Sequence, residues 1–169
     1  PNPLPASEEG GLKSSCGMDY RKLRDYLAQG KWKEADEETE RVMLAVAKRE
    51  KEGWLDTNSI DNFPCEDLRT IDQLWVKYSD GKFGFSVQKR IYQGLGGTTE
   101  YDDKIWQAFQ DKVGWNNYRL RYKMIRLMQV PIAYLPFPPK HTINFDTYLV
   151  IWDWDWVSSL TSRLVNCNI

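Results

Sequence analysis

Histidine is almost absent from this chain of 169 residues, which contains only His141. Ser-His and Cys-His catalytic pairs and multi-histidine metal sites therefore cannot be assembled from this chain alone. We interpret His141, in a proline-rich stretch, as a solvated loop residue. Its weaker alternative role is an axial ligand to a metal ion such as magnesium. The sequence thus favours a binding or structural protein over an enzyme.

Cysteine is also scarce. The three residues Cys16, Cys65 and Cys167 are far apart, odd in number and include no Cys-x-x-Cys pair. This pattern argues against a disulfide framework and against a zinc site, and it predicts a reducing compartment.

The chain has neither a strong charge nor a long apolar run. Its 23 Lys and Arg residues nearly balance 24 Asp and Glu residues, so the net charge is -1 and no nucleic-acid partner is expected. No stretch approaches the ~18 to 20 apolar residues of a membrane-spanning helix, which predicts a soluble or peripheral protein. Aromatic residues are plentiful at 14%, with eight Trp, and they supply large contact areas in cores and interfaces.

Hydrophobic spacing predicts an all-α domain. We expect residues 1–17 to form an extended arm, 18–136 the helical domain and 137–169 a C-terminal extension. Apolar residues recur every three or four positions in five segments. The first two expected helices run from Asp19 to Gly30 and from Trp32 to about Lys51, with an end at Gly53. The third begins at an N-cap in the segment from Asp61 to Pro64 and ends at Gly81. The fourth contains Val87, Ile91 and Leu95 and ends at Gly96, and the fifth runs from Tyr101 to Lys112.

Two blocks of the predicted helical domain resemble a known family. Residues 63–75 (FPCEDLRTIDQLW) and 78–88 (YSDGKFGFSVQ) are similar to the signature of the genomes-uncoupled-four domain. The tripeptide 113–115 (VGW) matches the block before the ligand loop of that family, so the resemblance covers about residues 19–136. Members of the family bind porphyrins and assist magnesium chelatase in chlorophyll synthesis.

The resemblance implies a compact helical cup of about six to eight helices with a concave apolar palm. The palm would hold protoporphyrin or its magnesium complex and present it to the chelatase. Apolar and aromatic walls desolvate the faces of a flat ring, and a few polar groups fix its edge. Trp115 is the best candidate for such a wall, with Val46, Leu55 and Val87 as weaker candidates.

The ligand loop departs from the family pattern. Where the family carries Asn-Ala-Pro-x-Gly-His-Leu-Pro, with a frequent cation at x, residues 129–136 are QVPIAYLP. Ile132 thus replaces the cation and Tyr134 the histidine, which removes two groups able to pair with carboxylates. Because an unpaired buried carboxylate costs several kcal/mol, roughly, a neutral or esterified, chlorophyll-like ligand fits better than a free acid, unless the palm holds protein instead. Met128, Gln129 and Arg126 are further candidates for ligand contact in this region. Arg126 or Lys140 could replace the missing cation.

Three tryptophans, Trp152, Trp154 and Trp156, lie close together in the extension. A helix would place the first and third of them on one stripe, whereas an extended strand would place all three on one side. In one interpretation the extension folds back and completes the core. In the other, the indoles insert into a partner protein or a membrane interface.

Two functions follow from these patterns. The changed loop and the added extension favour a non-catalytic linker subunit of a photosystem and its antenna, holding chlorophyll or another magnesium tetrapyrrole. The alternative is a carrier of protoporphyrin or magnesium protoporphyrin whose partner is the large subunit of magnesium chelatase. Either function predicts a plastid, thylakoid-associated protein or its cyanobacterial equivalent, with peripheral contact to the membrane.

Overall fold

The computed structural model describes residues 12–100, 102–115, 135–136 and 154–169, with the main chain alone at 154–156. The described ranges contain no strand, which confirms the all-α prediction there. None of the described helices is long and apolar enough to cross a bilayer. Within the described residues the seven helices are α1 (Arg21–Ala28), α2 (Trp32–Val46), α3 (Thr57–Asp61), α4 (Cys65–Tyr78), α5 (Phe85–Gly94), α6 (Asp103–Val113) and α8 (Trp154–Asn166).

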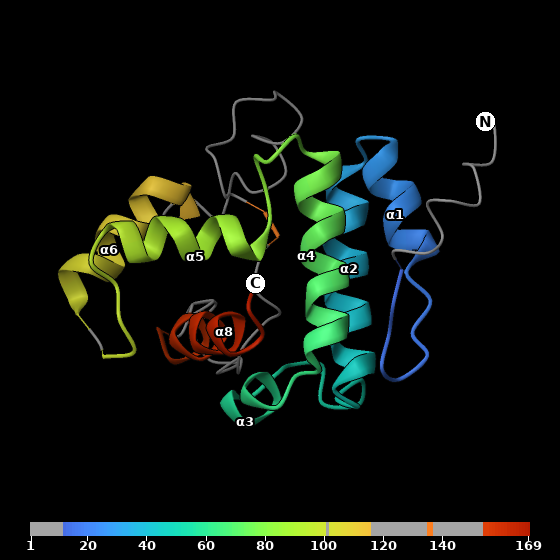
Figure 1. Ribbon diagram of the computed structural model, residues 1–169, viewed down its shortest axis with the longest axis horizontal. Helices are drawn as coiled ribbons and strands as arrows, with labels where there is room; N and C mark the ends of the chain where they lie inside the picture. The colour runs from blue at the N-terminus through green and yellow to red at the C-terminus, as the bar shows by residue number, and fades with distance from the viewer. Residues whose placement is uncertain (1–11, 101, 116–134, 137–153) are drawn as a thin grey trace, which may run out of the picture.

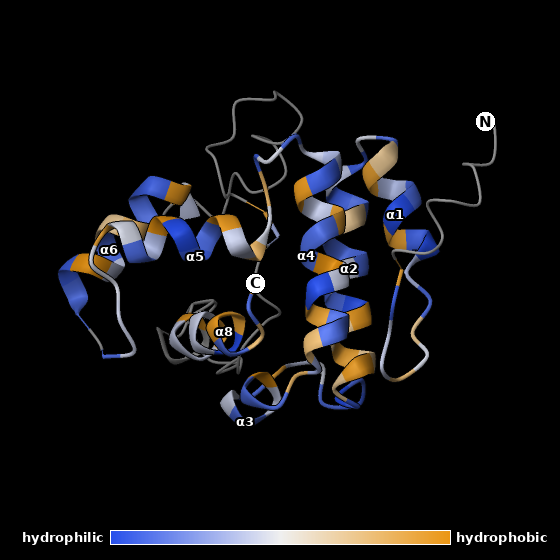
Figure 2. Cartoon of the chain, in the orientation of Figure 1, coloured by the Kyte–Doolittle hydropathy of each residue, from blue (hydrophilic) through white to orange (hydrophobic). Residues whose placement is uncertain are grey.

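The helices form two groups that meet at α8 (Figure 1). On one side α1 packs on α2 and α4, and on the other α5 packs on α6, while α8 contacts α3, α4 and α5. Polar and apolar residues alternate along α2 and α4, as amphipathic helices require (Figure 2). Inside the first group the Trp75 indole N–H donates to the Thr39 hydroxyl at 2.9 Å, and Trp32 stacks on Trp75 with ring centroids 6.2 Å apart.

The second helix is shorter than the sequence predicts. It ends at Val46 instead of near Lys51, because Lys48 adopts a left-handed conformation with φ of 57°. The Arg49 N–H donates to the Leu44 carbonyl at 2.8 Å and the Lys48 N–H to the Ala45 carbonyl at 3.1 Å. These two bonds form a Schellman motif, which usually has glycine at the left-handed position. Because a lysine holds that position, the sequence has no glycine to mark the end of the helix, and the prediction of an end at Gly53 was wrong.

A short helix that the sequence analysis did not predict precedes α4. Asp56 caps α3 by accepting a hydrogen bond from the Ser59 N–H at 2.7 Å. Asp61 is the last residue of α3 and therefore not the N-cap of the next helix, as had been predicted. The N-cap position of α4 is held by Pro64.

The structure corrects the prediction drawn from the cysteines. Cys65 and Cys167 form a disulfide whose partners are 102 residues apart in sequence, and only Cys16, which is exposed, is free. Sequence spacing gave no sign of this pair because α8 folds back on α4 and brings the two residues together. The argument against disulfides was wrong for this pair, and the prediction of a reducing compartment loses its basis.

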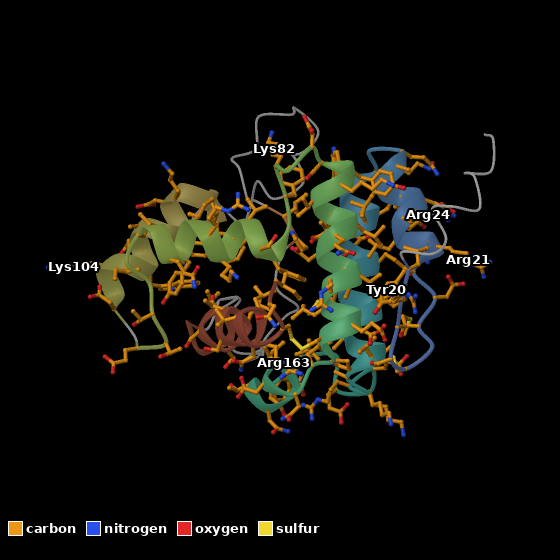
Figure 3. The ribbon with its side chains drawn as sticks, in the orientation of Figure 1. Tyr20, Arg21, Arg24, Lys82, Lys104 and Arg163 are labelled. Atoms are coloured by element: carbon orange, nitrogen blue, oxygen red, sulfur yellow. A yellow bond between two sulfur atoms is a disulfide. The ribbon has the colours of Figure 1, made fainter. Side chains whose placement is uncertain are left out.

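Asp67 joins the segment before α1 to the start of α4. Its carboxylate accepts hydrogen bonds from the Tyr20 hydroxyl at 2.8 Å, from the Ser15 N–H at 3.0 Å and hydroxyl at 2.6 Å, and from the Ser14 hydroxyl. Figure 3 labels Tyr20 beside α4. Burial by itself would raise the pKa of Asp67, but these hydrogen bonds outweigh it and hold the pKa below its usual value. The carboxylate therefore has a structural role.

Asp67→Asn is expected to lower the free energy of unfolding by about 1–3 kcal/mol at neutral pH, because an amide is a weaker acceptor than a carboxylate for the four groups that donate to it. The pKa is lower in the folded state, so the contribution of Asp67 is complete above about pH 4 and is lost as the pH falls through the folded pKa. Urea unfolding between pH 2 and pH 7 measures this. Asp61→Asn, at an exposed carboxylate, is the control, and equal pH profiles for the two variants would contradict the assignment.

Candidate functional site

A small hollow lies between α5, α6 and α8, with an enclosed volume of about 10 Å³. One wall is aromatic and is formed by Phe85, Phe109 and Trp115. Polar groups reach the hollow from Gln88 and Lys89 of α5. The opposite wall belongs to α8 and consists of Val157, Leu160, Thr161 and Leu164.

Trp115 reaches the hollow because α6 ends two residues before it, at Val113. Gly114 holds the C-cap position in the left-handed conformation with φ of 79°, which glycine adopts without steric cost. This turn directs the indole back onto Phe109, edge to face, with ring centroids 5.4 Å apart. Phe109 also contacts Tyr92 edge to face at 5.5 Å and stacks on Trp106 at 5.7 Å. Trp115 is only 2% exposed and is fixed within an aromatic cluster.

The position of α5 is set by α4 and by residues 135–136. The Ser86 N–H at the start of α5 donates to the Asp72 carboxylate at 2.8 Å, and the Gly84 N–H donates to the Leu135 carbonyl at 3.0 Å. The side-chain amide of Gln88 donates to the Pro136 carbonyl at 2.7 Å. Burial raises the pKa of Asp72 despite its hydrogen bonds to the start of α5. Asp72 thus joins α4 to the start of α5.

The C-terminal helix folds back onto the domain. Val157, Leu160 and Leu164 are buried there against the rest of the chain. For residues 157–169 this confirms the interpretation in which the extension completes the core. Trp152 lies outside the described residues, and so do the side chains of Trp154 and Trp156. Their role in partner binding therefore stays a prediction.

Among the residues predicted for the ligand site, only Trp115 lines this hollow. Val46, Leu55 and Val87 are buried core residues that are not part of its lining. The loop candidates and the possible metal ligand all lie outside the described residues, namely Arg126, Met128, Gln129, Ile132, Tyr134, Lys140 and His141.

Eight of the nine lining residues were not predicted from the sequence, and four of these eight belong to α5 and α6. Phe85, Gln88 and Lys89 occupy positions i, i+3 and i+4 of α5, so one face of that helix forms the wall. Phe109 occupies the centre of the aromatic cluster on α6. The spacing of the α5 residues was visible in the sequence. Val87 had been predicted instead. It is adjacent to these residues in sequence, and the face of α5 that lines the site cannot be identified without knowing which neighbour the helix packs against.

The hollow combines aromatic surfaces with three polar side chains, those of Gln88, Lys89 and Thr161, a pattern typical of sites for flat aromatic ligands. Its enclosed volume of about 10 Å³ has room for roughly one water molecule and is far below the roughly 300–1,000 Å³ of most small-molecule sites. A large ring therefore needs the α8 wall to move. Within the described residues, no group of three or more His, Cys, Asp or Glu side chains is placed to hold a metal ion.

Comparisons with known proteins identify the family. The family model described as GUN4-like matches residues 13–137. "Uncharacterized protein ycf53" of Porphyra purpurea is 40% identical over 111 residues, which cover 64% of this chain and 44% of that protein. "Tetrapyrrole-binding protein, chloroplastic" of Arabidopsis thaliana is 32% identical over 131 residues, which cover 75% of this chain and 44% of that protein.

The chain thus spans less than half the length of these two curated relatives. Among solved structures, GUN4 from Chlamydomonas reinhardtii superposes with a TM-score of 0.71 at 28% identity, covering 89% of this chain and 91% of that one. The family match spans most of the chain and includes Trp115. The residues that suggested the resemblance and the arrangement of the helices agree, and the chain belongs to the GUN4-like family.

Proposed function

We propose that the chain is a non-catalytic tetrapyrrole-binding protein whose ligand lies against the aromatic wall of Phe85, Phe109 and Trp115. The observation that carries this proposal is the family match over residues 13–137, which includes all three rings. The name of the Arabidopsis relative, a chloroplastic tetrapyrrole-binding protein, supports the ligand class and a plastid or cyanobacterial origin. Association with the thylakoid is part of the proposal.

Of the two functions predicted from sequence, the carrier is the better supported. A relative named for tetrapyrrole binding favours a protein that carries protoporphyrin or magnesium protoporphyrin to magnesium chelatase, as the resemblance implied. The photosystem-linker hypothesis relied on the altered loop and on the tryptophans of the extension. These lie outside the described residues, and no relative described above is named for a photosystem. We therefore propose the carrier and not the linker.

The ligand's charge is a finer point of the proposal. Lys89 is the one cationic side chain among the described residues lining the hollow, and its ammonium already donates to the Ile169 carbonyl. A free-acid ligand would have to displace that contact to pair its carboxylate. We therefore keep the expectation that a neutral or esterified tetrapyrrole binds more tightly. Titration with magnesium protoporphyrin and with its dimethyl ester, followed by the absorbance of the ligand, should give an ester affinity higher by about tenfold. Equal affinities would contradict it.

Trp115→Phe is expected to weaken tetrapyrrole binding by roughly 2- to 13-fold, because a smaller ring loses part of an aromatic contact worth about 0.5–1.5 kcal/mol. Trp106→Phe is the matched control: both indoles contact Phe109, but Trp106 does not line the hollow. Ligand absorbance is the suitable readout, since quenching cannot separate eight tryptophans. Equal losses in the two variants would place the ligand elsewhere.

A further inference from the structure

The disulfide joins α8, which forms one wall of the hollow, to the start of α4. Cys65 is the first residue of α4, and Cys167 follows the last residue of α8. In Figure 3 the sulfur–sulfur bond lies where α4 and α8 meet, close to the labelled Arg163. α8 supplies the whole wall of the hollow opposite Trp115. One covalent bond therefore fixes the end of the helix that limits the size of the hollow.

Three polar contacts hold the same end of the chain, and none is covalent. The Arg163 guanidinium donates to the Phe63 carbonyl at 2.7 Å. Arg69 donates to the Cys167 carbonyl and Lys89 to the Ile169 carbonyl. Each of these partly exposed bonds contributes only modestly to stability. The burial of Val157, Leu160 and Leu164 adds to them. Without the disulfide, α8 is thus held by contacts that can open locally.

The two sulfurs differ in access. Cys65 is partly exposed, whereas Cys167 is only 2% exposed. An incoming thiolate therefore reaches the Cys65 Sγ first, and Cys167 leaves as the thiolate. The Arg69 guanidinium binds the Cys167 carbonyl and so brings a positive charge to the residue that leaves as the thiolate, which favours its departure.

We propose that Cys65–Cys167 is a reversible redox site that fastens α8 over the aromatic hollow, with a dithiol as its reductant. One thiolate of the dithiol forms a mixed disulfide with Cys65 and releases Cys167. The second thiolate then displaces Cys65, so two electrons and two protons pass to the pair and the reductant becomes a disulfide. The oxidised form keeps the hollow small, and the reduced form lets α8 move away from Trp115. The link to ligand binding depends on the proposed function, but the release of α8 does not.

Hydrogen exchange tests the release of α8 without any ligand. In the full chain under native conditions, dithiothreitol should raise the exchange rates of the amides of residues 157–166 by at least about tenfold. The exchange rates of the α2 amides, on the far side of α4, should rise less than those of α8, because α2 experiences only the global destabilisation that loss of the cross-link causes. Cys65→Ser should show the fast rates with and without dithiothreitol, and Cys16→Ser, at the exposed free cysteine, should behave like the wild type. Unchanged α8 rates after reduction, or a disulfide that dithiothreitol reduces only in urea, would overturn the proposal.

Binding kinetics test the link to the hollow. Magnesium protoporphyrin should associate with the reduced chain about tenfold faster than with the oxidised chain, and Cys65→Ser should match the reduced chain. Equal rates in both forms would overturn the link while leaving the proposed function intact. Absence of binding in both forms would overturn the proposed function, and the exchange rates of α8 would still decide whether the redox site releases this helix.

Discussion

Gly84→Ala is expected to lower the free energy of unfolding by about 2–4 kcal/mol. Gly84 precedes α5 with φ of 135° and ψ of 156°, a region that is essentially open to glycine alone. A Cβ at this position would lie 2.8 Å from Val76 Cγ2 and 3.0 Å from the Asp72 carboxylate oxygen, which itself accepts the Ser86 N–H. The substitution therefore adds backbone strain to a steric clash at the junction that positions the aromatic wall.

Gly81→Ala is the matched control for this prediction. Gly81 also has a positive φ, of 74°, but no atom lies within 4 Å of the Cβ it would gain. Its replacement should cost only the left-handed penalty of about 1–2 kcal/mol. Urea unfolding followed by circular dichroism measures both variants. If Gly84→Ala costs no more than Gly81→Ala, the close approach of α4 to the start of α5 is not a determinant of stability.

Cys65→Ser is expected to have the larger effect, lowering the free energy of unfolding by about 4–5 kcal/mol relative to the oxidised wild type. The disulfide spans 102 residues, and in the chain-entropy account a cross-link of that length strongly restricts the unfolded state. This loss would be a large share of the about 5–15 kcal/mol that stabilises most domains.

Urea unfolding of oxidised wild type, reduced wild type and Cys65→Ser measures this effect. The last two should agree, because both lack the same bond. Cys16→Ser, which leaves the disulfide in place, should unfold at the wild-type midpoint. A Cys65→Ser midpoint equal to that of the oxidised wild type would mean that the pair is not joined in the native protein.

Local patterns in the sequence predicted the helices well where the stop signals were glycines. Gly96 adopts φ of 89° and the Gly97 N–H donates to the Tyr92 carbonyl at 2.9 Å, so α5 ends where the paired glycines predicted. The end of α2 was missed because Lys48 takes the position that glycine usually holds. A single non-glycine residue in a left-handed conformation carries no signature that periodicity can detect.

The site was harder to predict because its parts come from distant segments. Trp115 was found through the family motif, and the structure places it on the hollow. The opposite wall belongs to α8, beyond the extent of the resemblance, and periodicity could not decide whether that segment packed on its own core. The disulfide was missed for the same reason, since only the folded arrangement shows that Cys167 lies beside Cys65.

The measurement that tests the central claim most directly is hydrogen exchange of the full chain with and without saturating magnesium protoporphyrin. Binding against the aromatic wall predicts slower exchange in residues 85–89 and 109–115, the segments that carry Phe85, Phe109 and Trp115. Tight binding that leaves these two segments unchanged, with protection confined to other parts of the chain, would contradict the assignment of this hollow as the tetrapyrrole site.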